Sequence, residues 1–164
     1  MEDALTIYFN GEKYAGLILA AIALTAIVTA IVLFRANADL RSFAITLAVV
    51  ATAEIGLGVG LYVRTGPQVE RLAEQLRSEA AGVRAAETIR MTRVQRNFVV
   101  IEYVELCLIG VTAIAAFLLK VRPGPSGVAL GLLINASLLL AFDLLAERRG
   151  DQYVTALART NLSR

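Results

Sequence analysis

The chain has 164 residues, 57% of them hydrophobic, and its 16 basic and 14 acidic side chains leave a net charge of +2. This composition is more apolar than that of an ordinary soluble domain, and so small a net charge gives no electrostatic reason to expect a nucleic-acid partner. Because histidine is absent, His-based catalytic triads and metal or haem sites with His ligands are excluded.

The hydrophobic residues form four blocks, at 14–34, 43–63, 98–119 and 125–146. Each block holds about 20 residues, and a helix of that length spans the ~30 Å hydrocarbon core of a bilayer. The apolar residues run continuously and do not alternate with polar ones, which excludes transmembrane β-strands. The sequence therefore predicts an all-α integral membrane protein, a single-domain bundle of four transmembrane helices.

The longest polar stretch, residues 64–97, separates the second span from the third. Gly66-Pro67 predicts a turn with proline at the first position of a new helix. Apolar residues that include Leu72 and Leu76 then recur at helical spacing, and Gly82 predicts a break. We expect a helical hairpin here, whose second arm continues into the third span.

The segments outside the first and last spans are short. Residues 10–14 predict a turn after an interfacial N-terminal segment. Residues 147–160 predict a C-terminal helix that either continues the fourth span or lies along the interface. Four spans place both termini on one side, and basic residues are more numerous on that side, which favours cytoplasmic termini by the positive-inside rule. The preference for arginine over lysine favours a bacterial source, so we expect a multi-pass protein of a bacterial inner membrane.

Four acidic residues lie inside the spans, where there is no lysine or arginine: Glu54, Glu102, Glu105 and Asp143. An ionised carboxylate near mid-bilayer costs about 2.5–3.5 kcal/mol or more, so each must be neutralised or solvated. They could be protonated and hydrogen-bonded, could share a hard cation through their oxygens, or could line a water-filled path.

Depth along the helices suggests which acids meet. Counted from the terminus-side ends of their spans, Glu54 lies about 13 Å deep and Glu105 about 10 Å deep, so the two could face each other. Glu102 and Asp143 lie nearer the interface, where a salt bridge is the alternative to an ion-binding role. Asn135, near the middle of the fourth span, would need a hydrogen bond to another helix.

Three arginines, Arg90, Arg93 and Arg96, form a basic stripe just outside the third span. They are expected to bind lipid head-group phosphates. The chain carries no G-x-S-x-G, P-loop or H-E-x-x-H motif, so we expect neither enzymatic activity nor a cofactor. The sequence does not decide whether a metal is bound.

Scattered residues on the terminus side resemble a family of small four-span membrane proteins of proteobacteria. The resemblance runs over Tyr8-Phe9-x-Gly11-Glu12-Lys13-x-Ala15-Gly16-Leu17, Arg64-Thr65, Arg96-Asn97-Phe98 and Asp143-x-x-Ala146-Glu147-Arg148-Arg149-x-x-x-Tyr153. It implies four spans but no activity or ligand. It draws attention to a polar network on the terminus side that would include Glu12, Asp143, Glu147 and Arg149.

These features predict a small oligomeric channel or transporter for protons or hard cations. Glu54 and Glu105 would carry the ion, with Asn135 assisting. An oligomer is expected because four short spans rarely enclose a path, and Gly56-x-x-x-Gly60 and Gly127-x-x-x-Gly131 offer close-contact faces. The alternative is a non-catalytic scaffold or partner subunit that docks through residues 64–97.

Overall fold

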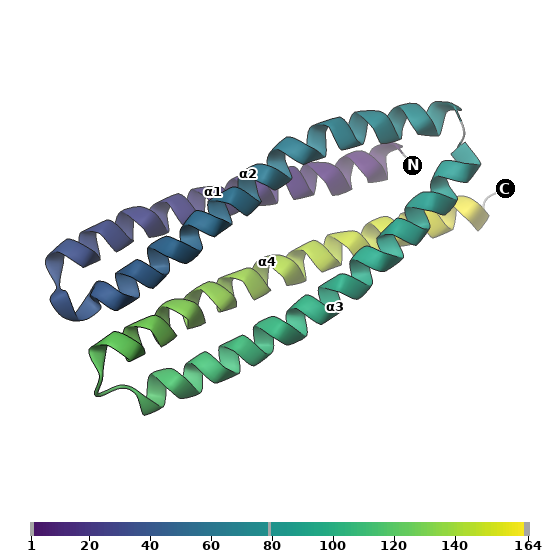
Figure 1. The fold of residues 1–164 in the computed structure, drawn as a ribbon. Coiled ribbons are helices and arrows are strands. Elements are labelled where there is room, and N and C mark those ends of the chain that lie inside the picture. Colours follow the sequence, from purple (N-terminus) through teal and green to yellow (C-terminus); the bar gives the residue numbers. More distant parts are fainter. Residues whose placement is uncertain (1, 79, 163–164) are drawn as a thin grey trace.

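The computed structural model describes residues 2–78 and 80–162, and this part of the chain is almost entirely helical. Four long helices follow one another: α1 (Glu2–Ala36), α2 (Arg41–Ser78), α3 (Ala80–Leu118) and α4 (Pro123–Leu162) (Figure 1). A short 3₁₀ helix, η1 (Ala38–Leu40), joins α1 to α2. Each long helix contains a stretch long and apolar enough to cross a membrane, which confirms the predicted helical class and the four apolar helices.

The helices are longer than the predicted spans. With 35 to 40 residues each, they measure about 52–60 Å, roughly twice the ~30 Å of a hydrocarbon core. The turn predicted at residues 10–14 is absent, because α1 runs unbroken through it. The turn predicted at Gly66-Pro67 is also wrong, since Pro67 lies inside α2.

Packing explains why α2 continues through its proline. A proline within a helix costs about 3 kcal/mol, but the following turns of α2 place Val69, Leu72 and Leu76 against a buried core. Complete burial contributes about 1.5–3 kcal/mol for each such side chain, so the partial burial of these three is comparable with the cost of the proline. The break expected at Gly82 also lies elsewhere, because α2 ends at Ser78 and α3 begins at Ala80.

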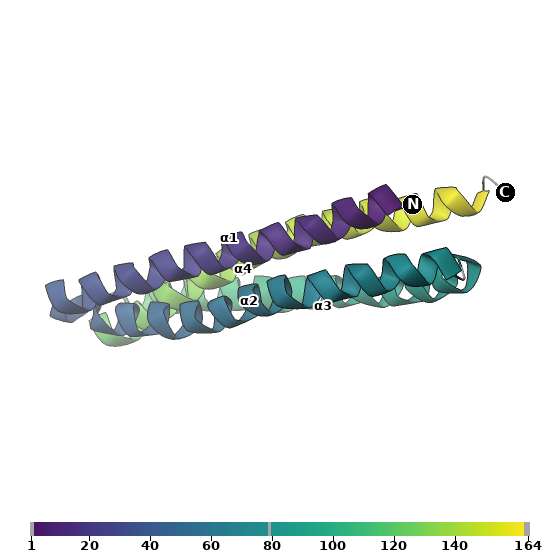
Figure 2. The ribbon, with the colours of Figure 1, turned by 90° about the horizontal axis from the view of Figure 1, so that it is seen from above.

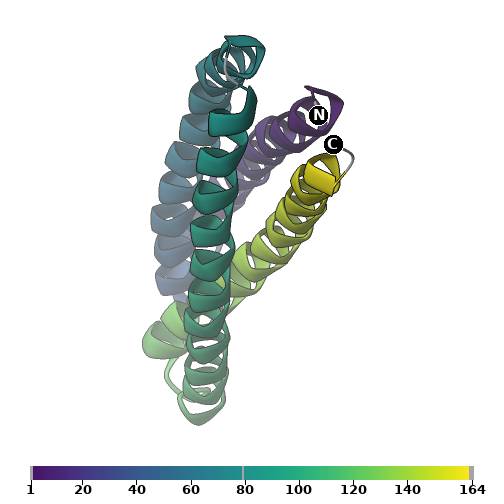
Figure 3. The ribbon, with the colours of Figure 1, turned by 90° about the vertical axis from the view of Figure 1, so that its right-hand side faces the viewer.

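The two hairpins, α1–α2 and α3–α4, lie side by side along their length (Figure 1). Near the α1–α2 and α3–α4 turns, α4 packs between α2 and α3. At the other end, where both termini lie, α1 pairs with α4 and α2 with α3 (Figures 2 and 3). Since α2 and α4 both begin at the turn end, these two helices are parallel.

Residues 64–97 do not stand alone as a hairpin. Their apolar side chains pack with the start of α1 and the end of α4 around a common core of Leu5, Tyr8, Phe9, Met91, Tyr153 and Leu157. We call this four-helix region, residues 2–13, 64–78, 80–97 and 147–162, the terminal bundle. Residues 147–160, expected either to continue the fourth span or to lie along the interface, are the last turns of α4.

Within the predicted spans, small side chains are buried and large apolar side chains are exposed, which is the reverse of the arrangement in a soluble protein. The buried hydrophobic residues are mostly alanines, such as Ala23, Ala30 and Ala51, whereas large residues such as Val104 and Phe117 point outward. Small residues at helix contacts and large apolar residues on the surface are typical of helices surrounded by lipid.

Candidate ion-translocation site

A row of acidic side chains follows the contact between α3 and α4. Asp143, Glu147 and Asp151 are spaced by four residues, which places them on one face of α4. The antiparallel helix α3 contributes the residues opposite. We call the set the acidic seam, and it consists of Gln95, Glu102, Glu105, Asp143, Glu147 and Asp151.

The residues of the seam meet in three pairs. The Glu105 and Asp143 carboxyl groups lie within hydrogen-bonding reach of each other, and so do those of Glu102 and Glu147. At the terminus-side end, the Gln95 amide Nε2 donates to the Asp151 carboxylate and, at 3.4 Å, to the backbone oxygen of Glu147.

The α3 member of the inner pair is buried, and Asp143 is half-buried. Glu105 is 8% exposed, and its Oε2 has no hydrogen-bond partner among the described residues, as is also true of Glu102 Oε1. Two ionised carboxylates this close in an apolar environment repel one another strongly unless a proton or a cation lies between them. The seam is therefore suited to hold positive charge.

Glu54 lies away from this seam. It is 1% exposed, and within the described structure neither of its carboxyl oxygens has a hydrogen-bond partner. The acids that act on Glu105 are Asp143 and Glu102, so the expected meeting of Glu54 with Glu105 does not occur. The reason is the helix order, because α4 lies between α2 and α3 at this depth.

Two glycines of α4 produce that order. A Cβ on Gly127 would lie 2.9 Å from the Phe43 nitrogen, and one on Gly131 would lie 2.9 Å from Thr46 Cβ. Only glycine allows α4 to approach α2 so closely. Gly127-x-x-x-Gly131 is thus a close-contact face between two helices of the same chain, whereas we expected it to offer a face for an oligomer. Gly56 and Gly60 differ, because a Cβ added to either would meet no described atom within 4 Å.

Asn135 does not bridge two helices as expected. It is 3% exposed, but its Nδ2 donates within α4, to the Gly131 carbonyl at 2.7 Å. Gly131 of α4 lies level with Thr46 of the parallel helix α2. From that level, Asn135 is about one turn further along α4, whereas Glu54 is about two turns further along α2. The two side chains therefore differ in depth by about 6 Å.

The terminal bundle contains a polar core that the sequence did not indicate. Glu87, 5% exposed, accepts hydrogen bonds from Arg90 at 2.7 and 2.8 Å and from the Tyr153 hydroxyl at 3.2 Å. Tyr153 stacks on Tyr8 with ring centroids 4.8 Å apart, and Tyr8 donates to Glu12 at 2.5 Å. Burial raises the pKa of both tyrosines above the ordinary range, so both remain donors.

This core changes the interpretation of the predicted basic stripe. Arg90 is paired with Glu87 and lies over the Phe9 ring, 5.9 Å from its centroid. Its guanidinium is therefore engaged by the Glu87 carboxylate, while its side chain remains 37% exposed. Arg93 and Arg96 remain on the surface, where they line a shallow hollow with Ile89 and Thr92. The spacing of Glu87 and Arg90 indicated their pairing but not the burial of Glu87.

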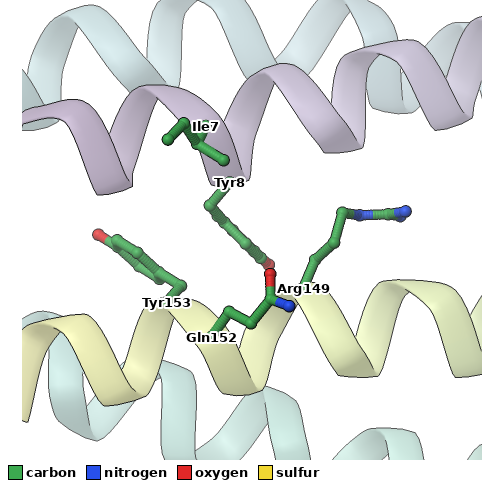
Figure 4. Close-up of a pocket in the computed structure, with 5 residues that line it drawn as sticks. All are labelled: Ile7, Tyr8, Arg149, Gln152 and Tyr153. Atoms are coloured by element: carbon green, nitrogen blue, oxygen red, sulfur yellow. The ribbon is translucent and has the colours of Figure 1, made fainter.

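An open groove of about 210 Å³ lies between α1 and α4, lined by Ile7, Tyr8, Arg149, Gln152 and Tyr153 (Figure 4). Arg149 extends along it, away from the tyrosines, and a Cβ on Gly11 would lie 2.7 Å from its Cδ. This face of α4 is opposite the acidic seam, so Arg149 does not join Asp143 and Glu147 in the polar network that the resemblance implied.

No family model, curated protein or solved structure matches the chain. Of the predicted site residues, the structure brings together Glu102, Glu105 and Asp143, adds Glu147, Asp151 and Gln95 to them, and leaves Glu54 and Asn135 at other helix contacts. The i, i+4 spacing of Asp143, Glu147 and Asp151 is the sequence signal that could have identified the α4 side of the seam.

Proposed function

We propose that the protein is a small membrane channel or transporter that moves protons or hard cations along the acidic seam. The Glu105–Asp143 pair carries this proposal. Both carboxyl groups belong to predicted spans, they lie within hydrogen-bonding reach of each other, and the charged groups that act on Glu105 are themselves acidic. Ionisable residues so placed are costly in a membrane and mark ion or proton paths by default.

A purely structural role would be served at lower cost by other side chains. Asparagine or glutamine could link α3 and α4 by hydrogen bonds without the desolvation cost of a carboxylate. The presence of two acids, Glu105 and Asp143, at one contact between α3 and α4 instead supports reversible binding of positive charge. Two further acids, Glu102 and Glu147, lie one turn away. Glu54, isolated on α2, would be a second and separate binding position.

The surroundings of the acidic seam support two further parts of the proposal, an aqueous end of the path and association with another subunit. The terminal bundle provides an aqueous end for the path at Gln95 and Asp151, on the side we assign to the cytoplasm of a bacterial cell. An open face on α2, with Gly56 and Gly60 free of contacts within the described residues, supports association with a second copy or a membrane partner subunit.

Reconstitution in liposomes tests the proposal. Purified protein is inserted in vesicles that contain dyes for pH, sodium or calcium, and a gradient of each ion is imposed. We expect flux of at least one of these ions from the native chain and its loss in Glu105→Gln. Glu74→Gln, which changes an exposed acid of the terminal bundle, should retain the flux. Well-folded native protein that passes no ion would contradict the proposal.

The scaffold alternative has less support, because part of its expected docking surface packs within the chain. Leu72 and Leu76, which were expected to bind a partner, pack against the core of the terminal bundle. A partner would have to use the outer face of the terminal bundle, and the absence of flux would be the result that favours this alternative.

A further inference from the structure

The acidic seam is continuous from the terminal bundle into the predicted membrane region. Its outer end is the contact of Gln95 with Asp151, followed inward by the Glu102–Glu147 pair and then by the Glu105–Asp143 pair. From Asp151 to Asp143 the seam covers eight residues of α4, or about 12 Å. The acids thus form a sequence of steps along one helix contact.

We infer that the ion handled by the seam is the proton, and that it reaches Glu105 from the terminal-bundle end through the Glu102–Glu147 pair. This inference rests on the proposed function and names its substrate. Two steps lead to it: the way in which the carboxyl groups are paired, and the distance between successive pairs.

Pairing favours a proton over a hard cation. Each pair consists of two carboxyl groups within hydrogen-bonding reach of each other, an arrangement in which one shared proton both removes a charge and forms the hydrogen bond. A calcium ion takes six to eight oxygen ligands, and magnesium demands an octahedral set. Two carboxyl groups supply at most four of these oxygens, and among the described residues no group of three or more acidic, His or Cys side chains is placed to hold a metal ion.

Spacing favours transfer between the pairs. Glu102 and Glu105 are three residues apart on α3, and Asp143 and Glu147 are four apart on α4, so each side chain has its counterpart one turn away. Such neighbours have Cβ atoms about 5–6 Å apart, a separation that the carboxyl groups or one bridging water can cross.

Unpartnered oxygens provide the acceptor positions for a proton. Glu105 is more than nine-tenths buried, and its Oε2 has no hydrogen-bond partner in the described residues. Glu102 Oε1 is likewise buried without one. A proton relay requires an unused acceptor oxygen in each pair, because an incoming proton must bind to one oxygen before a second proton leaves the pair.

Infrared spectroscopy of the full chain in lipid nanodiscs tests the inference. A protonated carboxyl gives a C=O stretching band that is distinct from the carboxylate bands and shifts in D₂O. Glu54→Gln serves as the background in all samples, because it removes the isolated carboxyl of α2. We expect the band at neutral pH to be reduced in Glu105→Gln and in Asp143→Asn and to be unchanged in Glu74→Gln.

The entry route has its own measurement. Glu102→Leu interrupts the seam between the bundle and Glu105, so deuterium exchange of the remaining band should be slowed after transfer to D₂O. Unaltered exchange would overturn the route. Size-exclusion profile and helical circular dichroism of each variant verify that the fold is retained, and the Asp143→Asn variant gives a second test if Glu105→Gln does not fold.

The two proposals fail in different ways. If the band is absent, or if sodium or calcium abolishes it while those ions cross liposomes in a Glu105-dependent manner, the inference is wrong and the proposed function stands. If the band behaves as expected but no ion crosses, the proposed function is wrong, and the shared proton is a structural hydrogen bond between α3 and α4.

Discussion

Gly16 of α1 and Gly58 of α2 meet backbone to backbone. A Cβ on Gly16 would lie 2.6 Å from the Gly58 carbonyl oxygen, and one on Gly58 would lie 2.5 Å from that of Gly16. Backbone atoms cannot move aside as the end of a flexible side chain can. This crossing sets the separation of α1 and α2 one turn away from the buried Glu54.

Alanine at this crossing should destabilise the protein. Gly58→Ala is expected to cost about 1–3 kcal/mol, because the added methyl group forces the two helices apart. Gly60→Ala is the matched control on the same helix, since its Cβ would enter open space, and it should be neutral. Thermal unfolding in detergent measures both, and equal melting temperatures would show that the helices do not cross at Gly58.

Loss of the Tyr153 hydroxyl should weaken the terminal bundle. Tyr153→Phe keeps the ring stacked on Tyr8 but removes the hydrogen bond to the buried Glu87, at a cost of about 0.5–1.5 kcal/mol. The same change at Tyr14, whose side chain is exposed, should have no effect. Chemical denaturation of the full chain compares the two variants; a silent Tyr153→Phe would mean that Glu87 is satisfied by Arg90 alone.

The arginines of the predicted stripe should separate into two functional types. Arg90→Gln removes the ion pair with buried Glu87 and is expected to lower stability by about 1–3 kcal/mol. Arg93→Gln combined with Arg96→Gln should leave stability unchanged and reduce the binding of anionic lipids. Unfolding and native mass spectrometry with added phosphatidylglycerol measure these properties, and a loss of lipid binding in Arg90→Gln alone would contradict the assignment.

Replacement of Glu54 by leucine should stabilise the protein. Glu54→Leu has a similar volume and removes a buried carboxyl group whose two oxygens have no partner in the described structure, so we expect a gain of about 1–3 kcal/mol. Glu70→Leu, at an exposed position of α2, is the control. A gain in stability together with a loss of flux would identify Glu54 as a functional site that is maintained at a cost in stability. Destabilisation would show that the carboxyl group is satisfied in the membrane.

The sequence alone was sufficient for the features that depend on composition along the chain. Four apolar blocks with no basic residue predict four long apolar helices, and the cost of burying Glu105 or Asp143 marks them as candidates without reference to a partner. Local turn signals were less informative. Gly66-Pro67 would end an isolated helix, but burial of Leu72 and Leu76 in the terminal bundle outweighs that preference.

Only the tertiary structure decided which side chains meet. Periodicity shows on which face of its own helix Glu54 or Glu105 lies, but it does not show which other helix packs against that face. Gly127 and Gly131 bring α4 against α2, which separates Glu54 from Glu105 and pairs Glu105 with Asp143. The structure likewise shows that the Glu87 carboxylate that pairs with Arg90 is buried in the terminal bundle. Helix order results from close packing between residues far apart in the chain, and no local pattern contains that information.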